Sequence, residues 1–465
     1  MPPQLATLTS IIVILYLFRA DQKSKAEGVS KAIWVPYAWA FIAGSRFVSQ
    51  WLNPNATLTS AEAYLDGSPL DRAVFLILII IAIAILIRRN LNWRMLFKNN
   101  TWIWLFLLFG LISVLWSDYP FVSFKRWVKA LGTPLMALVI LTEERPLEAI
   151  GVMVRRLAYV LLPLSVLFIK YYPHLGRMYH MGQPMFTGVA LQKNGLGQIC
   201  LVVGVYYCWD LLFNRTNRND LRRRHLFPLH LLILLMLGWL IYMANSSTSL
   251  LCLIIAIGML IVGRMGAVSK APVRIVRVGL MAVLIVGALE ATLGVSAQLI
   301  AILGRDPTLT SRVPIWHTLL TMAGNSWLGV GYESFWLGRR LPVLLETVGV
   351  MNAHNGYLET YLNIGLVGLA LVVALMISGL VKVVKQITTD YRFAVLRLTF
   401  IIVVAVYNWT EATLYGVNNM WLLLFLGIID YRQQRNTVIA VKDNAGRHAR
   451  IGQVRFTDHA TNRMS

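Results

Sequence analysis

Runs of apolar residues, each long enough to cross a bilayer, recur along almost the whole chain. They measure roughly 16 to 22 residues, and at about 1.5 Å per residue a helix of that length covers the hydrocarbon core. With 57% apolar and only 14% charged residues, a soluble protein would expose more apolar surface than it could bury. The sequence therefore predicts an all-α, polytopic integral membrane protein.

About 12 to 13 transmembrane helices are expected from these runs. The candidates lie near 5–19, 33–52, 72–87, 101–116, 127–142, 157–172, 194–213, 226–243, 247–263, 275–293, 357–380, 394–411 and 416–430. Two connections, 173–193 and 294–356, are much longer than the others. Loops of that length in a compact protein are usually functional.

The longer connection, 294–356, is expected to cover an outward-facing cavity. Residues 313–322 and 341–350 within it are apolar enough to form short helices that lie in the membrane interface. Its tryptophans are expected to be anchors at the level of the lipid headgroups: Trp316, Trp327 and Trp336.

The basic residues predict the orientation. If residues 20–32 are cytoplasmic and each run crosses once, the cytoplasmic segments hold 31 Lys and Arg and the opposite side holds 11. The positive-inside rule then puts the N-terminus outside and the C-terminus inside, and the net charge of +22 needs no nucleic acid partner. We expect one transmembrane domain, 1–430, with the outer segment 294–356 inserted, and a basic, disordered cytoplasmic tail, 431–465.

Cations outnumber anions in the outer segments close to the spans. They are Lys125, Arg126, Lys129, Lys170, Arg177, Lys193, Arg312, Arg339 and Arg340. Guanidinium groups match phosphate oxygens in pairs, so such a set could hold a diphosphate and stabilise it as a leaving group without a metal. Each of these charges, taken alone, could equally face solvent or lipid headgroups.

Arg46 lies inside an otherwise uncharged run. A charge at that depth is costly unless it faces a polar cavity, so Arg46 is expected to have an anionic partner. The alternative is that its side chain reaches the outer headgroups.

His354 lies where the long outer segment enters the next span. The helix dipole at a helix N-terminus disfavours imidazolium, which keeps a histidine able to accept a proton and suits a general base. The alternative is a surface residue or a helix cap. The histidines lack metal-ligand spacing, so no metal is expected. Asp118 remains a weaker candidate for a metal ligand or base, because no second carboxylate accompanies it.

Three segments in order resemble the signature of the O-antigen ligase and polymerase superfamily. They are Thr310-Ser-Arg-Val-Pro-Ile-Trp, Trp327-Leu-Gly-Val-Gly-Tyr-Glu-Ser-Phe-Trp and His354-Asn-Gly-Tyr-Leu-Glu-Thr-Tyr. Ala43-Gly-Ser-Arg and Val189-Ala-Leu-Gln-Lys-Asn-Gly-Leu-Gly are similar to elements of the exopolysaccharide-polymerase branch. The segment Ala244-Asn-Ser-Ser-Thr-Ser departs from the pattern, because many relatives carry a basic residue after a serine there.

The resemblance implies inverting, metal-independent glycosyl transfer at the periplasmic face of a bacterial inner membrane. The donor would be a saccharide on undecaprenyl pyrophosphate, and the acceptor a growing exopolysaccharide or O-antigen. Arg312 matches the arginine that binds the pyrophosphate, and His354 the histidine that activates the acceptor. Arg46, Arg126, Lys193, Asn194 and Asn355 would complete the substrate site.

Neither a Walker loop nor a dinucleotide fingerprint in the right context occurs in the sequence, so no cofactor is expected. Membrane lipids and proteins of polysaccharide export or chain-length control are the other expected partners. Two alternatives stay open: an O-antigen ligase that transfers glycan to lipid A core, and a transporter of lipid-linked sugar. A scaffold without catalysis would tolerate loss of both Arg312 and His354.

Overall fold

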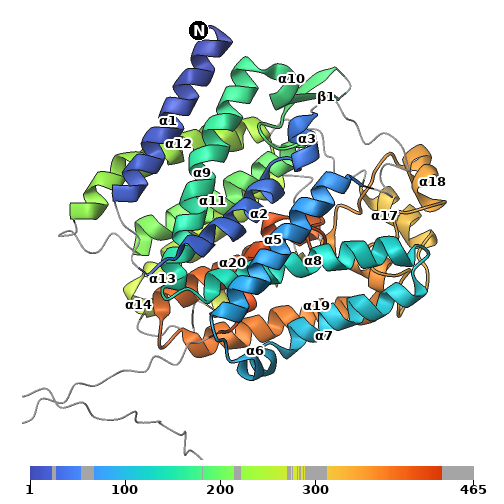
Figure 1. Cartoon of the computed structure of the whole chain (residues 1–465). Coiled ribbons are helices and arrows are strands. Elements are labelled where there is room, and N and C mark those ends of the chain that lie inside the picture. Colours follow the sequence, from blue (N-terminus) through green and yellow to red (C-terminus); the bar gives the residue numbers. More distant parts are fainter. Residues whose placement is uncertain are drawn as a thin grey trace, which may run out of the picture. The chain divides into compact units, whose positions relative to one another are not determined.

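The computed structural model describes residues 1–23, 28–53, 67–180, 182–213, 221–269 and 312–431, with scattered short stretches between 274 and 288. Residues Met1–Asp430 form one compact unit. Almost all of its described secondary structure is helical (Figure 1), which confirms the all-α class. The predicted tail, 431–465, lies outside the described residues except for Tyr431, and so does the outer stretch 294–311.

Seven helices among the described residues are long and apolar enough to cross a membrane. They are α1 (Pro3–Lys23), α5 (Pro69–Arg88), α9 (Pro146–Tyr171), α11 (Lys193–Phe213), α13 (Ser247–Arg264), α19 (Gly356–Gln386) and α20 (Tyr391–Thr410). The pair α6 (Trp93–Asn99) and α7 (Thr101–Ile112), which continues as η2 (Ser113–Trp116), would be an eighth span with an 85° bend. The chain is thus a multi-pass membrane protein.

The remaining predicted spans are shorter or less apolar helices. They are α2 (Trp34–Gly44) with α3 (Val48–Leu52), α8 (Pro120–Leu141), α12 (Leu221–Ala244) and α21 (Asn419–Ile428). The run at 33–52, predicted as one span, is two helices, because the backbone leaves the helical conformation at Ser45. The predicted span at 275–293 lies largely outside the described residues. Short η1 (Lys31–Ile33) and α14 (Gly266–Ser269) complete the connections.

The two long outer connections contain structure of their own. The first holds α10 (Pro173–Gly176) and an antiparallel hairpin of β1 (Arg177–His180) and β2 (Gln183–Phe186), in which Arg177 is opposite Phe186. The second holds α17 (Arg312–Thr321) and α18 (Arg340–Thr347), which confirms the two short helices predicted there.

A small apolar core holds the second connection together. Leu319, Phe335, Trp336, Leu344 and Leu362 are buried in it. The prediction that Trp336 is a headgroup anchor is therefore wrong: only 3% of this residue is exposed, whereas Trp327 is 65% exposed. Trp336 is inside because its indole donates a hydrogen bond to the buried Glu359 carboxylate.

A break in α19 fastens this connection to the helix bundle. The helix is interrupted at Ile364 and Gly365, and Gly365 has φ +65°. The amides of Leu366 and Val367, which have lost their helical partners, donate to the carbonyls of Ser326 and Trp327 at 2.9 and 3.2 Å. The break thus forms a docking edge for the segment 326–331.

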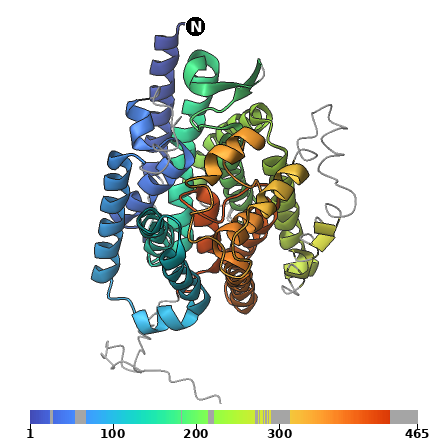
Figure 2. The same cartoon turned by 90° about the vertical axis from the view of Figure 1, so that its right-hand side faces the viewer.

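Both views of the structure place the outer segments at one end of the helices. In Figure 1 the start of α1 and the hairpin lie at the top, α17 and α18 lie at the right-hand side, and α6 lies at the lower margin. In Figure 2 the start of α1, the hairpin, α17 and α18 all lie above α6. Within the bundle, α19 packs along α7 and α20, and α11 packs against α12 and α13. Residues that the sequence assigns to one side of the membrane therefore share one end of this unit.

Candidate functional site

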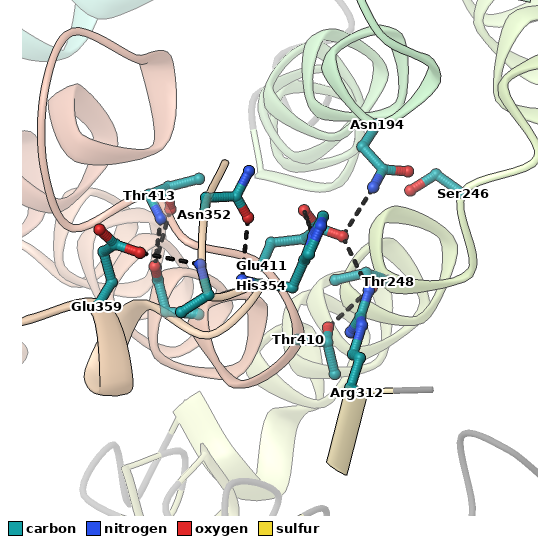
Figure 3. A network of polar contacts seen from close by, with 12 residues as sticks. Asn194, Ser246, Thr248, Arg312, Asn352, His354, Glu359, Thr410, Glu411 and Thr413 are labelled. Atoms are coloured by element: carbon teal, nitrogen blue, oxygen red, sulfur yellow. Dashed lines mark hydrogen bonds and ion pairs between the residues drawn. The ribbon is translucent and has the colours of Figure 1, made fainter. Parts of the chain in front are cut away.

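A single carboxylate is the centre of the polar contacts at this end. Glu411 is the residue that caps α20, and 9% of it is exposed. Its Oε1 accepts a hydrogen bond from Asn194 Nδ2 at 2.8 Å and lies 3.4 Å from Arg312. Its Oε2 lies 3.8 Å from His354 Nδ1. Figure 3 shows these three side chains converging on Glu411 from different elements.

The position of Glu411 is electrostatically unfavourable by itself. The C-terminus of a helix carries partial negative charge, which repels a carboxylate. The Arg312 guanidinium and the Asn194 amide offset this repulsion, and α11 and α17 bring them to the end of α20. Sites of this kind, where local preference is overruled by long-range contacts, are typical of function.

His354 is held by contacts on both sides of it. Its backbone has φ +47°, a left-handed conformation that is uncommon for residues other than glycine. Its amide donates to Asn352 Oδ1 at 2.9 Å, and the preceding Ala353 amide donates to Glu359 Oε2, also at 2.9 Å. The Gly356 amide donates to the Glu411 carbonyl at 3.0 Å. The turn that carries His354 is therefore fixed against α19 and α20.

The two nitrogens of His354 have different surroundings. Nδ1 is buried, faces Glu411 and makes no hydrogen bond within the described part of the chain. The side chain as a whole is 28% exposed, so the exposure falls on the rest of the ring. A histidine oriented through Nδ1 can accept a proton at Nε2, which is the arrangement that a general base requires.

Asn355 performs a structural task. It is the N-cap of α19, and its Oδ1 accepts hydrogen bonds from the amides of Tyr357 and Leu358, both at 3.0 Å. The side-chain oxygen of this residue, which is predicted to bind substrate, is therefore bound by the helix.

Arg46 contacts residues of α3 and α10. It is 7% exposed, donates to the carbonyl of Leu175 in α10 and stacks over the Trp51 ring at 5.9 Å. The sequence predicted an anionic partner for Arg46. Among the described residues, its contacts are instead a carbonyl and an aromatic face, and no carboxylate pairs with it. Its contacts join α2 to the first outer connection.

Arg126 belongs to a second polar group. It donates to the carbonyl of Glu333 at 2.5 Å, and the Glu333 carboxylate accepts from the Gly416 amide at 2.9 Å. Burial and the neighbouring Glu333 raise the pKa of the Tyr332 phenol well above its usual range, so it stays neutral. Gly416 and Glu411 lie in the same connection between α20 and α21, which links the two groups.

Two further predicted residues have clear positions. Lys193 is half-buried and begins α11, one position before Asn194. Asp118, the alternative metal ligand or base, pairs with Arg340 at 2.6 Å. No cluster of three His, Cys, Asp or Glu side chains suited to a metal occurs in the described ranges.

Sequence reasoning missed Glu411. Glu411 is the last residue of the predicted span 394–411 and is therefore not among the predicted outer carboxylates. An acidic residue directly after the apolar run 394–410 is the signal that could have revealed it.

The segment 244–249 also lies beside the site. Thr248 Oγ1 is 2.8 Å from Thr410 Oγ1, and Ser246 caps α13 by accepting from the Ser249 amide (Figure 3). This segment, which departs from the motif that the sequence resembles, thus places hydroxyl groups here.

Comparison with known proteins identifies the same region. Residues 231–373 match the O-antigen ligase family; this range includes Arg312 and His354 and ends before Glu411. The exopolysaccharide production protein ExoQ of Rhizobium meliloti (strain 1021) is 24% identical over 309 residues, which cover 64% of this chain and 68% of the relative. Both findings support glycan processing of the ligase or polymerase type. Together with the helical membrane fold, they support the similarity of this chain to an O-antigen ligase/polymerase-like superfamily, which its motifs predicted.

Proposed function

We propose that the protein transfers a saccharide from undecaprenyl pyrophosphate to a sugar acceptor at the periplasmic face, and so elongates an exopolysaccharide or O-antigen. One observation carries the proposal: Arg312 and His354 face the same carboxylate, Glu411. A cation for a diphosphate and a base for a hydroxyl are thereby adjacent. The name of the ExoQ relative favours exopolysaccharide as the product.

The reaction needs few groups. The acceptor hydroxyl oxygen attacks the anomeric carbon, the bond from that carbon to the diphosphate oxygen breaks, and the electron pair leaves on the diphosphate. His354 takes the hydroxyl proton, and Arg312 stabilises the developing charge on the diphosphate. Attack from the face opposite the leaving group inverts the anomeric centre. The cation replaces a metal in this scheme, and neither redox chemistry nor ATP enters it.

The other predicted residues have supporting places in this proposal. Lys193 and Asn194, at the start of α11, would contact the outer phosphate, where the helix N-terminus also favours an anion. Arg126, which donates to the Glu333 carbonyl, would hold the saccharide or a second phosphate. Arg46 would shape the wall of the site through α10, and Asn355 would fix the turn that carries His354.

Loss of either central residue tests the proposal. His354→Ala and Arg312→Ala should each lower polymer output in a deletion strain at least about tenfold, with normal amounts of inserted protein. The matched controls are His317→Ala, at an exposed position of the same outer connection, and Arg94→Ala, at an exposed position of α6. Unchanged output from the His354 variant would reject the general base and favour transport of the lipid-linked sugar.

The matched O-antigen ligase family supports a second candidate, transfer of glycan to lipid A core. The glycans of the deletion strain separate the two. Single repeat units on lipid A indicate a lost polymerase, whereas long chains that accumulate on undecaprenyl diphosphate indicate a lost ligase.

A further inference from the structure

Glu411 is not within hydrogen-bonding distance of all three of its polar neighbours. Oε1 accepts hydrogen bonds from Asn194 at 2.8 Å and from Arg312 at 3.4 Å. Oε2 lies 3.8 Å from His354 Nδ1. The last distance is too long for a hydrogen bond. The Glu411 carboxylate is therefore within hydrogen-bonding distance of the Arg312 guanidinium but not of the His354 ring.

Nδ1 of His354 is the group left without a partner by this arrangement. It is buried and makes no hydrogen bond in the described part of the protein. A buried polar atom without a partner is unfavourable and calls for an explanation. A small movement of the Glu411 carboxylate towards His354 would satisfy it.

A diphosphate would compete with Glu411 for Arg312. Both are anions, and the Arg312 and Glu411 side chains are each 12% exposed, so their pairing is only partly screened by solvent. A diphosphate carries more charge than a carboxylate and accepts hydrogen bonds from the guanidinium in pairs. A bound donor would therefore take Arg312 and release Glu411.

We propose that Glu411 is a positioning residue that couples donor binding to the orientation of His354, an inference that rests on the function proposed above. In the empty site Glu411 neutralises Arg312. With a donor bound, the Glu411 carboxylate turns to His354 and accepts a hydrogen bond from Nδ1–H. Nε2 is then the free nitrogen, and it takes the acceptor proton. The resulting imidazolium is stabilised beside Glu411 until it releases that proton to water.

Such coupling delays activation of the base until a donor is present. The carboxylate itself touches neither the anomeric carbon nor the transferred proton. Its effect on the reaction passes through Arg312 and His354.

The inference predicts opposite effects of one substitution on binding and on transfer. In Glu411→Gln the competing charge is gone, so purified protein in detergent micelles should bind farnesyl diphosphate at least about threefold more tightly than the wild type. Polymer output in cells should fall at least about tenfold, because His354 loses its ionic partner. A residue with a purely structural role would weaken both.

Glu346→Gln is the matched control, because it removes one negative charge from an exposed position in the same outer connection. It should change neither measurement. Glu411→Asp, which keeps the charge on a shorter side chain, should bind the probe no more tightly than the wild type. This second variant also decides the matter if the glutamine variant is poorly folded, because tighter binding by the aspartate variant would contradict competition by charge.

Failure of the inference and failure of the proposed function give different results. Equal or weaker binding of farnesyl diphosphate by Glu411→Gln, with the Arg312→Ala variant still impaired, would overturn only the coupling. If the wild type does not bind the probe, or Arg312→Ala binds it equally well, the diphosphate site itself is wrong.

Discussion

At the scale of single residues, the site depends on charged groups whose partners lie far away in the chain. Arg312 reaches Glu411, and Glu359, 1% exposed, accepts from Trp336, Asn363 and the Ala353 amide. The contact between Arg312 and Glu411 would act in substrate binding, whereas the hydrogen bonds of Glu359 hold the turn before His354. These two roles predict different consequences of substitution.

Arg312→Lys should lower polymer output by about tenfold even though the charge is kept. Lysine is a point charge and cannot donate two parallel hydrogen bonds to phosphate oxygens as a guanidinium does. Polysaccharide yield, normalised to inserted protein, measures the effect. Full output from the lysine variant would mean that simple charge attraction is sufficient.

Glu359→Gln should lower the stability of the protein by roughly 1–3 kcal/mol. The amide nitrogen of glutamine would face donors where the carboxylate now accepts from Trp336 Nε1 at 2.5 Å and the Ala353 amide at 2.9 Å. Thermal unfolding in detergent measures the change, with Glu346→Gln as the control. Equal melting temperatures of the Glu359 variant and the wild type would contradict this role for the buried carboxylate.

At the scale of elements, the break in α19 matters most. A continuous helix would satisfy its own amides and leave the segment 326–331 without a docking edge. Gly365 permits the break through its positive φ, and its Cα lies close to the chain that docks there. A Cβ at this position would be 2.2 Å from the Trp327 carbonyl oxygen.

Gly365→Ala should therefore detach the segment 326–331 from α19, because the added Cβ would collide with the Trp327 carbonyl oxygen. Gly349→Ala is a matched control, because Gly349 has φ +66° but nothing within 4 Å of an added Cβ. A positive φ is unfavourable for alanine at both positions, whereas the ψ of −168° and the steric clash with Trp327 are features of Gly365. Limited proteolysis between α17 and α18 should be faster only in the Gly365 variant, and equal rates would contradict the docking role of the break.

At the scale of the whole molecule, the charge asymmetry predicts which end faces the periplasm. Glu346, in α18, is exposed at the end that carries the candidate site, and Arg94, in α6, is exposed at the other end. The native cysteines interfere little, because Cys200 and Cys252 are buried and Cys208 is half-buried.

Cysteine labelling tests this orientation. In cells with a permeabilised outer membrane, Glu346→Cys should react with a membrane-impermeant maleimide, and Arg94→Cys should react only after the inner membrane is lysed. The reverse pattern would place the candidate site in the cytoplasm and would remove the proposed periplasmic reaction.

The sequence by itself determined the properties that depend on local spacing. Run length specifies helices that cross a bilayer, and the order of the Arg312 and His354 motifs indicates the superfamily. It did not reveal that Arg46 binds a carbonyl, that Trp336 is buried or that Glu411 joins Asn194, Arg312 and His354. Only the tertiary structure decided these, because α11, α17, α19 and α20 meet through packing between segments far apart in the chain, which no local period encodes.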